Sequence, residues 1–278
     1  MAAISTTEPA EQKLFGQWRP AGSFAQFSVL LGWNLRSLLH DRRLVVIHLV
    51  EPLVLLIVFS QVFGRMADPS HFPQGVNYVS YLMPAILVTS GVSSAVSSGS
   101  ELVEQMNNGL LTRFRALPIG VHWILVARAV TDVLKTAVQS VLLLCCAAAF
   151  FGFRPAGGVV GSAEAVLLAL VVITSLTWLF IALGAWLKSA QAMQAIGSLT
   201  LFPLMFASSA FVPMEVLPTW LRAFAYVNPV SYAVTATRSL ALDWPVGSEV
   251  IAALVTSLGV MVVAMTVAIR IFRRPWTR

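Results

Sequence analysis

Six apolar segments, each close to the length of a bilayer-spanning helix, dominate this sequence. They cover approximately residues 44–63, 78–98, 121–151, 163–187, 193–212 and 250–269. A helix needs ~20 residues to cross the ~30 Å hydrocarbon core, so each segment can span it. Hydrophobic residues make up 58% of the 278 residues and charged residues only 11%, whereas a soluble domain is about 25% charged. We therefore expect an all-α integral membrane protein with six transmembrane helices and no soluble catalytic domain.

The distribution of Lys and Arg predicts how the chain is oriented. The two ends of the sequence and the segments after the second and fourth apolar runs carry twelve of the 18 basic residues, against four on the other side. Cytoplasmic segments are enriched in Lys and Arg, so we expect a multi-pass protein of the plasma membrane with both termini cytoplasmic. Residues 1–20 are polar and lack the apolar region of a signal peptide, so the first span would direct insertion. The net charge of +6 fits this topology and contacts with membrane lipid, and no basic cluster indicates nucleic-acid binding.

Residues 1–43 are expected to form a cytoplasmic segment before the transmembrane domain, which covers residues 44–278. Apolar residues recur there at three- and four-residue spacing: Phe24, Phe27, Leu31, Leu35 and Leu38. This period predicts an amphipathic helix over residues 23–40 that lies flat on the membrane surface. The alternative is a flank that only directs insertion of the first span.

The segment 213–245, before the last span, is too long for a turn and too apolar for a loop in water. Proline is favoured in the first turn of a helix, so Pro218 and Pro229 could each begin a short helix. We expect helices over residues 214–226 and 230–240, forming a re-entrant hairpin in the outer leaflet.

Two arginines in this hairpin are costly to bury. Arg222 and Arg238 lie among apolar residues, and each charge must either reach outward or find a partner. Glu215 and Asp243 are the nearest acidic residues in the sequence. We therefore expect each arginine either to reach outward or to find a partner.

Four ionisable residues fall inside the predicted spans. Glu51 lies in the first span, and Arg128, Asp132 and Lys135 lie in the third. Charged residues at membrane depth are rare and often functional. Asp132 follows Arg128 by four residues, so the two share a helix face. Two interpretations stay open: a polar lining or gate of a transport path, and a structural ion pair near the inner interface.

The second span carries small residues at four-residue spacing. Gly91, Ala95 and Gly99 form this stripe, and beside it lie Ser90, Ser94 and Ser98. Small residues at this spacing let helix backbones approach closely, so helix packing is the first interpretation. A serine-lined path for a substrate is the second.

The cytoplasmic loop 99–120 combines charged and apolar residues. Ser100 is placed to cap a helix whose first turn holds Glu101 and Glu104, because acidic residues favour the positive end of the helix dipole. Gly109 is expected to end this helix. The basic and helix-ending residues that follow are Arg113, Arg115 and Pro118. A structured amphipathic loop on this side is suited to docking a partner protein.

No nucleotide-binding, hydrolase or metal motif occurs in the sequence. A phosphate-binding loop, G-x-x-x-x-G-K-[ST], needs glycine amides and a lysine around the phosphates, and no lysine here follows a glycine. Neither H-E-x-x-H nor G-x-S-x-G is present. Cys145 and Cys146 are adjacent in an apolar run, which suits neither a disulfide framework nor a metal site. We therefore expect this chain to hold no catalytic residue, metal or cofactor.

Two parts of the sequence resemble a known family, the type-2 permeases of ABC exporters. Glu104 to Gly109, then Arg113, then Leu117-Pro118 resemble the E-x-x-x-x-G…R…L-P loop of this family. A later segment is similar to the signature that follows the fifth span in permeases of the daunorubicin-resistance type. The matching residues are Phe211-Val212-Pro213, Leu217-Pro218-Thr219-Trp220-Leu221, Asn228-Pro229-Val230-Ser231-Tyr232 and Arg238. The resemblance covers nearly the whole chain. One departure is Asn107-Asn108, where the family often has a charged residue before the glycine.

The resemblance implies a half-transporter without ATPase activity of its own. Two such permeases, identical or not, would pair with two cytoplasmic ABC ATPase subunits, which would hold ATP and Mg²⁺. A coupling helix would lie within residues 101–118, and the implied contacts with the ATPase are Glu101, Glu104, Gly109, Arg113, Arg115 and Pro118. The external hairpin would be an exit gate formed by Pro218, Trp220, Asn228, Pro229, Tyr232 and Arg238. The implied substrates are amphipathic drugs or lipids.

A polysaccharide-exporting ABC permease and an ion-coupled secondary transporter are the alternatives. Sugar channels tend to carry aromatic residues along their spans, whereas the tryptophans here mostly fall near predicted membrane interfaces. Inverted repeats and midplane carboxylates would favour a secondary transporter, and the sequence shows no internal repeat. A membrane scaffold that transports nothing is the third alternative. Co-purification with a P-loop ATPase separates the ABC permease from the last two.

Overall fold

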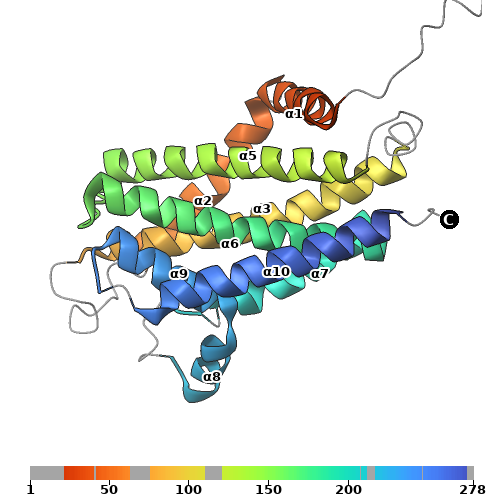
Figure 1. The fold of residues 1–278 in the computed structure, drawn as a ribbon. Coiled ribbons are helices and arrows are strands. Elements are labelled where there is room, and N and C mark those ends of the chain that lie inside the picture. The colour runs from red at the N-terminus through yellow and green to blue at the C-terminus, as the bar shows by residue number, and fades with distance from the viewer. Residues whose placement is uncertain are drawn as a thin grey trace, which may run out of the picture.

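A computed structural model describes residues 22–40, 42–62, 76–109, 121–206, 208–211, 217–245 and 247–273. Within these ranges the chain is helical and contains no strand (Figure 1). The helices are α1 (Ser23–His40), α2 (Arg42–Val62), α3 (Tyr78–Asn107), α5 (Val121–Phe150), α6 (Gly158–Leu187), α7 (Ala190–Phe206), α8 (Thr219–Val227), α9 (Pro229–Ala241) and α10 (Ser248–Arg273). The expected all-α architecture is confirmed for this part of the chain.

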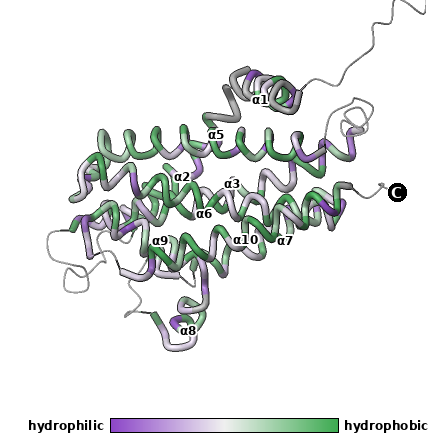
Figure 2. The backbone as a smooth tube through the Cα atoms, viewed as in Figure 1, coloured by the Kyte–Doolittle hydropathy of each residue, from purple (hydrophilic) through white to green (hydrophobic). Residues whose placement is uncertain are grey.

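Four helices in the described ranges are long and apolar enough to cross a membrane: α3, α5, α6 and α10. Figure 2 shows that these helices are mostly hydrophobic along their length. α2 and α7 lie at the positions of the first and fifth predicted spans. α2 has 21 residues, and α7 has 17 residues, with Pro203 near its end. The structure therefore defines a multi-pass bundle with four clear candidate spans.

α3 is the central helix of this bundle. Of its apolar window 89% is buried inside the protein, compared with 17% for α10. Its neighbours include α2, α6, α7 and α9. The small residues of the second span lie at the contact with α6, where Gly91 faces the side chain of Ile173 and Gly99 faces the backbone of Phe180. The helix-packing interpretation of this stripe is confirmed.

α1 is formed by the residues for which the apolar period predicted a helix. Figure 1 shows α1 nearly end-on beside α5, while α5 runs across the picture. Phe27 of α1 packs on Trp123 near the start of α5, with 6.0 Å between the ring centroids. α1 therefore crosses the bundle, which is the orientation expected of a helix lying along a membrane surface.

α8 and α9 correspond to the two short helices predicted between the fifth and sixth spans. Pro218 directly precedes α8, and Pro229 is the first residue of α9. The start predicted at residue 214 lies outside the described residues. α9 packs against α3, α6 and α10, whereas α8 projects from the bundle (Figure 1).

The predicted helix cap at Ser100 is wrong. α3 continues without interruption through Asn107, and Ser100 is a buried residue inside it. Its hydroxyl donates to the carbonyl oxygen of Val96, one turn earlier, at 3.2 Å. The next apolar residues of α3, Leu102 and Val103, are buried as well, and this packing extends the helix. The helix does end before Gly109, whose φ of 72° is left-handed, as predicted for this glycine.

We expect Gly99→Ala to destabilise the contact between α3 and α6. A Cβ at Gly99 would lie 2.7 Å from the carbonyl oxygen of Phe180, so the two backbones would have to separate. Overpacking of this kind costs about 1–3 kcal/mol, and the thermal unfolding temperature of the purified protein should fall. Gly259→Ala on α10 is the matched control, because a Cβ there meets nothing within 4 Å. Equal unfolding temperatures for the two variants would contradict the close backbone contact.

Candidate functional site

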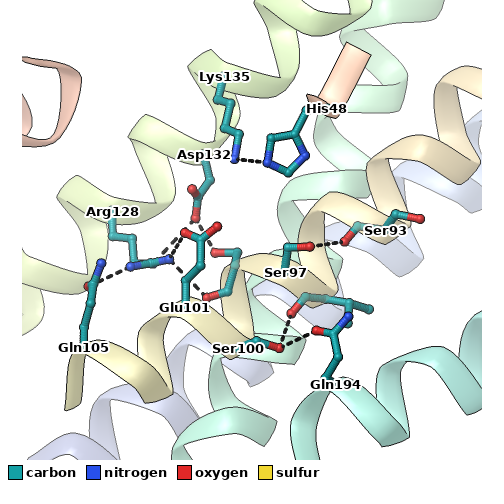
Figure 3. A network of polar contacts seen from close by, with 12 residues as sticks. His48, Ser93, Ser97, Ser100, Glu101, Gln105, Arg128, Asp132, Lys135 and Gln194 are labelled. Carbon is teal, nitrogen blue, oxygen red and sulfur yellow. Dashed lines mark hydrogen bonds and ion pairs between the residues drawn. The ribbon is translucent and has the colours of Figure 1, made fainter. Parts of the chain in front are cut away.

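Arg128, near the start of α5, is the centre of a polar cluster that reaches α3 (Figure 3). The residue is only 8% exposed. Its Nη1 donates to Gln105 Oε1 at 2.7 Å, and its Nη2 donates to Glu101 Oε2 at 2.9 Å and to the Ser98 carbonyl oxygen at 3.2 Å. Asp132 lies one turn further along α5, with Oδ2 3.8 Å from Arg128 Nε. The guanidinium thus pairs with two carboxylates and ties α5 to α3.

The same cluster extends to α2. The Ser98 hydroxyl donates to the Asp132 carboxylate, and Lys135 Nζ lies 2.9 Å from His48 Nε2 on α2 (Figure 3). An ammonium group can only donate, so His48 Nε2 accepts in this contact. Gln139 Nε2 adds a bond of 2.8 Å to the His48 carbonyl oxygen. We call the side chains of His48, Ser98, Glu101, Gln105, Arg128, Asp132, Lys135 and Gln139 the inner cluster; it joins α2, α3 and α5.

The other residues predicted for this end of the protein lie outside the inner cluster. Glu51 is exposed on α2, one turn beyond His48. Glu104 is exposed near the end of α3, and Gly109 follows that helix. The last three residues predicted for this end lie outside the described residues: Arg113, Arg115 and Pro118. The structure therefore brings together three of the four predicted intramembrane charges and adds Glu101 to them.

One face of α3 is polar and partly open. Ser93, Ser94 and Ser97 are only partly buried, although most of α3 is enclosed by other helices. The Ser97 hydroxyl donates to the Ser93 carbonyl oxygen at 3.1 Å. Ser100 donates to Gln194 Oε1 of α7 at 3.0 Å (Figure 3), which places the polar edge of α7 beside these serines.

A second buried charge lies near the other end of α3. Arg238, on α9, is 3% exposed. Its Nε donates to the Tyr81 carbonyl oxygen at 3.1 Å, and its Nη2 donates to the carbonyl oxygens of Ser209 at 2.9 Å and Ala210 at 3.1 Å. The guanidinium carbon lies 3.7 Å from the centroid of the Tyr81 ring, a cation–π contact. Arg238 therefore joins α9, the start of α3 and the residues that follow α7.

Neither outcome expected for Arg238 is found among the described residues. Its side chain is buried and does not reach outward, and it makes no ion pair with a described acidic residue. Asp243 is exposed, with a left-handed φ of 54°, and no described carboxylate lies within ion-pair distance of Arg238. Residues 208–211 are not helical, so their carbonyl oxygens are available to the guanidinium. Arg222 also donates to a carbonyl oxygen, since its Nη2 lies 3.2 Å from that of Leu217. Glu215 lies outside the described residues.

Asn228, between α8 and α9, connects these two helices to α7. Its Oδ1 accepts from the Val230 amide at 2.9 Å and caps α9, while its Nδ2 donates to the Leu204 carbonyl oxygen at 2.8 Å. The last four carbonyls of a helix lack helical partners, and Leu204 lies in the last turn of α7. Tyr232 donates to the Tyr226 carbonyl oxygen at 2.7 Å, near the end of α8. The other three predicted hairpin residues, Pro218, Trp220 and Pro229, are exposed.

Several residues of these clusters were not singled out from the sequence. Tyr78 and Tyr81 lie one turn apart at the start of an apolar run, and this amphipathic pair could have drawn attention. Gln105 follows Glu101 by four residues and shares its face. Ser209 and Gln194 carry no local signal, because only the three-dimensional contact reveals them.

The fold and the two charge clusters describe an all-helical membrane protein that presents polar groups near both ends of a central helix. The chain belongs to the ABC-2 type transporter family, whose model matches residues 25–242. It is a transmembrane permease subunit of an ABC exporter, and its family implies a partner ATPase subunit.

Named relatives support this assignment. The chain is 31% identical over 229 residues to the daunorubicin resistance ABC transporter permease protein DrrB1 of Streptomyces coeruleorubidus, covering 80% of this chain and 77% of the relative. It is 26% identical over 221 residues to a probable doxorubicin resistance ABC transporter permease protein, DrrC, of Mycobacterium tuberculosis, covering 77% and 76% of the two chains. A putative transport permease of Porphyra purpurea, ycf38, is 26% identical over 208 residues, or 73% and 70% of the two chains.

We expect Arg128→Gln to destabilise the protein more than loss of the whole Arg128–Asp132 pair. The single change leaves Asp132 enclosed without its cation, and removing one partner of a buried ion pair costs about 3–5 kcal/mol. The double variant Arg128→Gln/Asp132→Asn removes both charges and should recover part of the loss in thermal unfolding of the purified permease. Arg270→Gln, at an exposed position of α10, is the control. A double variant no more stable than the single one would show that Asp132 does not depend on Arg128.

Proposed function

We propose that this permease moves amphipathic drugs or lipids outward across the plasma membrane, driven by ATP hydrolysis on a separate nucleotide-binding subunit. The observation that carries the proposal is the 31% identity, over 80% of this chain, to a permease named for daunorubicin resistance. Two permease subunits, identical or not, would form one transporter with two ATPase subunits. The absence of a phosphate-binding loop from the sequence supports a separate energy source.

Six membrane spans are part of this proposal. α2 and α7 would be the first and fifth spans, α1 would lie on the cytoplasmic surface, and both termini would be cytoplasmic. The Lys and Arg distribution supports this orientation. Both α2 and α7 pack on α3, so they belong to the same bundle as the four candidate spans.

The transport path would follow the open polar face of α3. Ser93 and Ser97 present hydroxyl groups on this face, and Gln194 of α7 lies beside it. On α7, Leu199 is 76% exposed and Phe202 is 65% exposed, so apolar surface adjoins the polar groups. A surface of this mixed character suits a molecule that has both an apolar body and a polar group.

Coupling to the ATPase would occur at the end of α3. Glu104 is exposed there, and Glu101 lies in the inner cluster, bonded to Arg128 of α5. A force applied at this end would therefore reach α5 through the Glu101 and Gln105 contacts, and α2 through Lys135 and His48. The residues of loop 99–120 that follow Gly109 would complete the docking surface.

Charge reversal at Glu104 tests the coupling role. In a complex with its ATPase, Glu104→Lys should reduce ATP-driven doxorubicin efflux about tenfold or more while ATP hydrolysis continues, because like charges would face each other at the docking surface. The permease alone should release phosphate only at background rate. Glu164→Lys, exposed near the start of α6, is the matched control and should transport normally. Normal efflux by Glu104→Lys would remove Glu104 from the coupling surface.

Cysteine labelling tests whether the external hairpin lies in the outer leaflet. Trp220 is 67% exposed from the protein and Tyr232 39% exposed, so these side chains must meet either lipid or water. Burial of a large apolar side chain is worth about 1.5–3 kcal/mol, which favours lipid. In a background with Cys145 and Cys146 replaced by Ala, cysteines at Trp220 and Tyr232 should react slowly with an impermeant maleimide. A cysteine at Ala156, exposed between α5 and α6, is the fast control; equally fast labelling at all three positions would show a water-exposed loop.

A further inference from the structure

Residues 208–211, which follow α7, are a short stretch of non-helical backbone inside the bundle. Ser208, Ser209, Ala210 and Phe211 are all buried. Their carbonyl oxygens cannot rely on helix bonds, and a buried peptide group without a partner is costly, most of all within a membrane. The partners that satisfy these carbonyls therefore decide where this stretch of chain can lie.

Side chains of α3 and α9 donate hydrogen bonds to these carbonyls. The Ser209 carbonyl oxygen accepts a hydrogen bond from Arg238 Nη2 at 2.9 Å and a long one from the Tyr81 hydroxyl at 3.5 Å. The Ala210 carbonyl oxygen accepts from the same Arg238 nitrogen at 3.1 Å, and the Phe211 carbonyl oxygen accepts from the Tyr78 hydroxyl at 3.3 Å. The stretch is therefore held by side chains, so a single substitution can release it without breaking a helix.

The same stretch joins α2 to the chain that continues α7. The ring of Phe211 stacks on Phe59 of α2, with 4.2 Å between centroids and 16° between ring planes. The ring of Phe206, the last residue of α7, has its centroid 5.8 Å from that of the Phe211 ring. Both α2 and α7 pack on α3, whose polar face is partly open further along the helix. At this end of the bundle, the aromatic contacts connect α2 to the end of α7 and the residues that follow it.

We propose that Arg238, with Tyr78 and Tyr81, clamps residues 208–211 against α3 and so keeps the outer end of the transport path closed. The proposal rests on the proposed function for the path, and it assigns Arg238 a positioning role. The guanidinium makes the clamp because it donates to α3 and to two adjacent carbonyls at once, while its face rests on the Tyr81 ring. Lysine has the same charge but lacks this planar fork, so it cannot reproduce the set of contacts.

Accessibility of a buried thiol tests the clamp directly. Ser209→Cys is introduced in the full-length permease with Cys145 and Cys146 replaced by Ala, and an impermeant maleimide is applied outside intact cells. Ser209 is 4% exposed, so labelling should be slow with the clamp intact. Arg238→Gln and Arg238→Lys should each accelerate labelling about tenfold or more, because Gln removes the charge and Lys lacks the planar fork that holds several carbonyls at once.

Two further variants make the labelling result decisive. Arg154→Gln, at an exposed position just after α5, is the matched control and should label as slowly as the parent. Tyr78→Phe removes one hydroxyl and keeps Arg238, so it should fold even where the Arg238 variants do not, and it should label faster than the parent. If neither Tyr78→Phe nor any folded Arg238 variant labels faster than Arg154→Gln, the clamp does not exist.

A leak assay tests whether the clamp closes the path. Vesicles containing the permease–ATPase complex are loaded with doxorubicin and its passive escape is measured without ATP. Clamp variants should leak faster than the Arg154→Gln control, and faster labelling without faster leakage would overturn the assignment of closure. ATP-driven efflux by the parent complex is measured first. If that efflux is absent, the proposed function fails on this probe, while the labelling experiment still decides the clamp.

Discussion

In hydrocarbon, every buried charge and every non-helical peptide group needs a partner within the protein. Much of this structure follows from that requirement. Arg128 meets it with two carboxylates and a side-chain amide, so its charge is neutralised. Arg238 meets it with carbonyl dipoles and an aromatic face, so its charge is solvated but not neutralised. The first arrangement joins three helices, and the second holds an irregular stretch of backbone in place.

Both arrangements are built on α3. Tyr81 lies near the beginning of this helix and Ser98 near its end, about 25 Å away at 1.5 Å per residue. α3 is continuous between them, and its contact with α6 is close because Gly99 and Gly184 let the backbones approach. A displacement of one end of α3 is therefore carried to the other by a rigid element. This would give a physical route between the proposed ATPase-facing end and the proposed outward-facing end, which the labelling and efflux measurements can probe separately.

The helices themselves were predictable, because the signals for them are local. The apolar period of residues 23–40 and the Asn228-Pro229 break are read from neighbouring residues, and α1 and α9 begin at or within one residue of the predicted starts. The cap at Ser100 failed because packing of Leu102 and Val103 outweighed a local preference. The partners of Arg238 could not be predicted at all, since Tyr81 is 157 residues away in the sequence. The expected ion pair between Arg128 and Asp132 was visible because both lie on one helix.

The enclosed position of α3 has a consequence for how the chain is made. Of the four candidate spans, α3 is the least hydrophobic and the most enclosed, while α6, which covers it, is the most hydrophobic. Partition of a nascent helix from the translocon into lipid depends on its own hydrophobicity, and the serines of α3 weaken that tendency. Yet α6 leaves the ribosome about fifty residues after α3 ends. During synthesis, contacts with the translocon or with α2 would shelter the serines of α3 from lipid until α6 arrives to cover them.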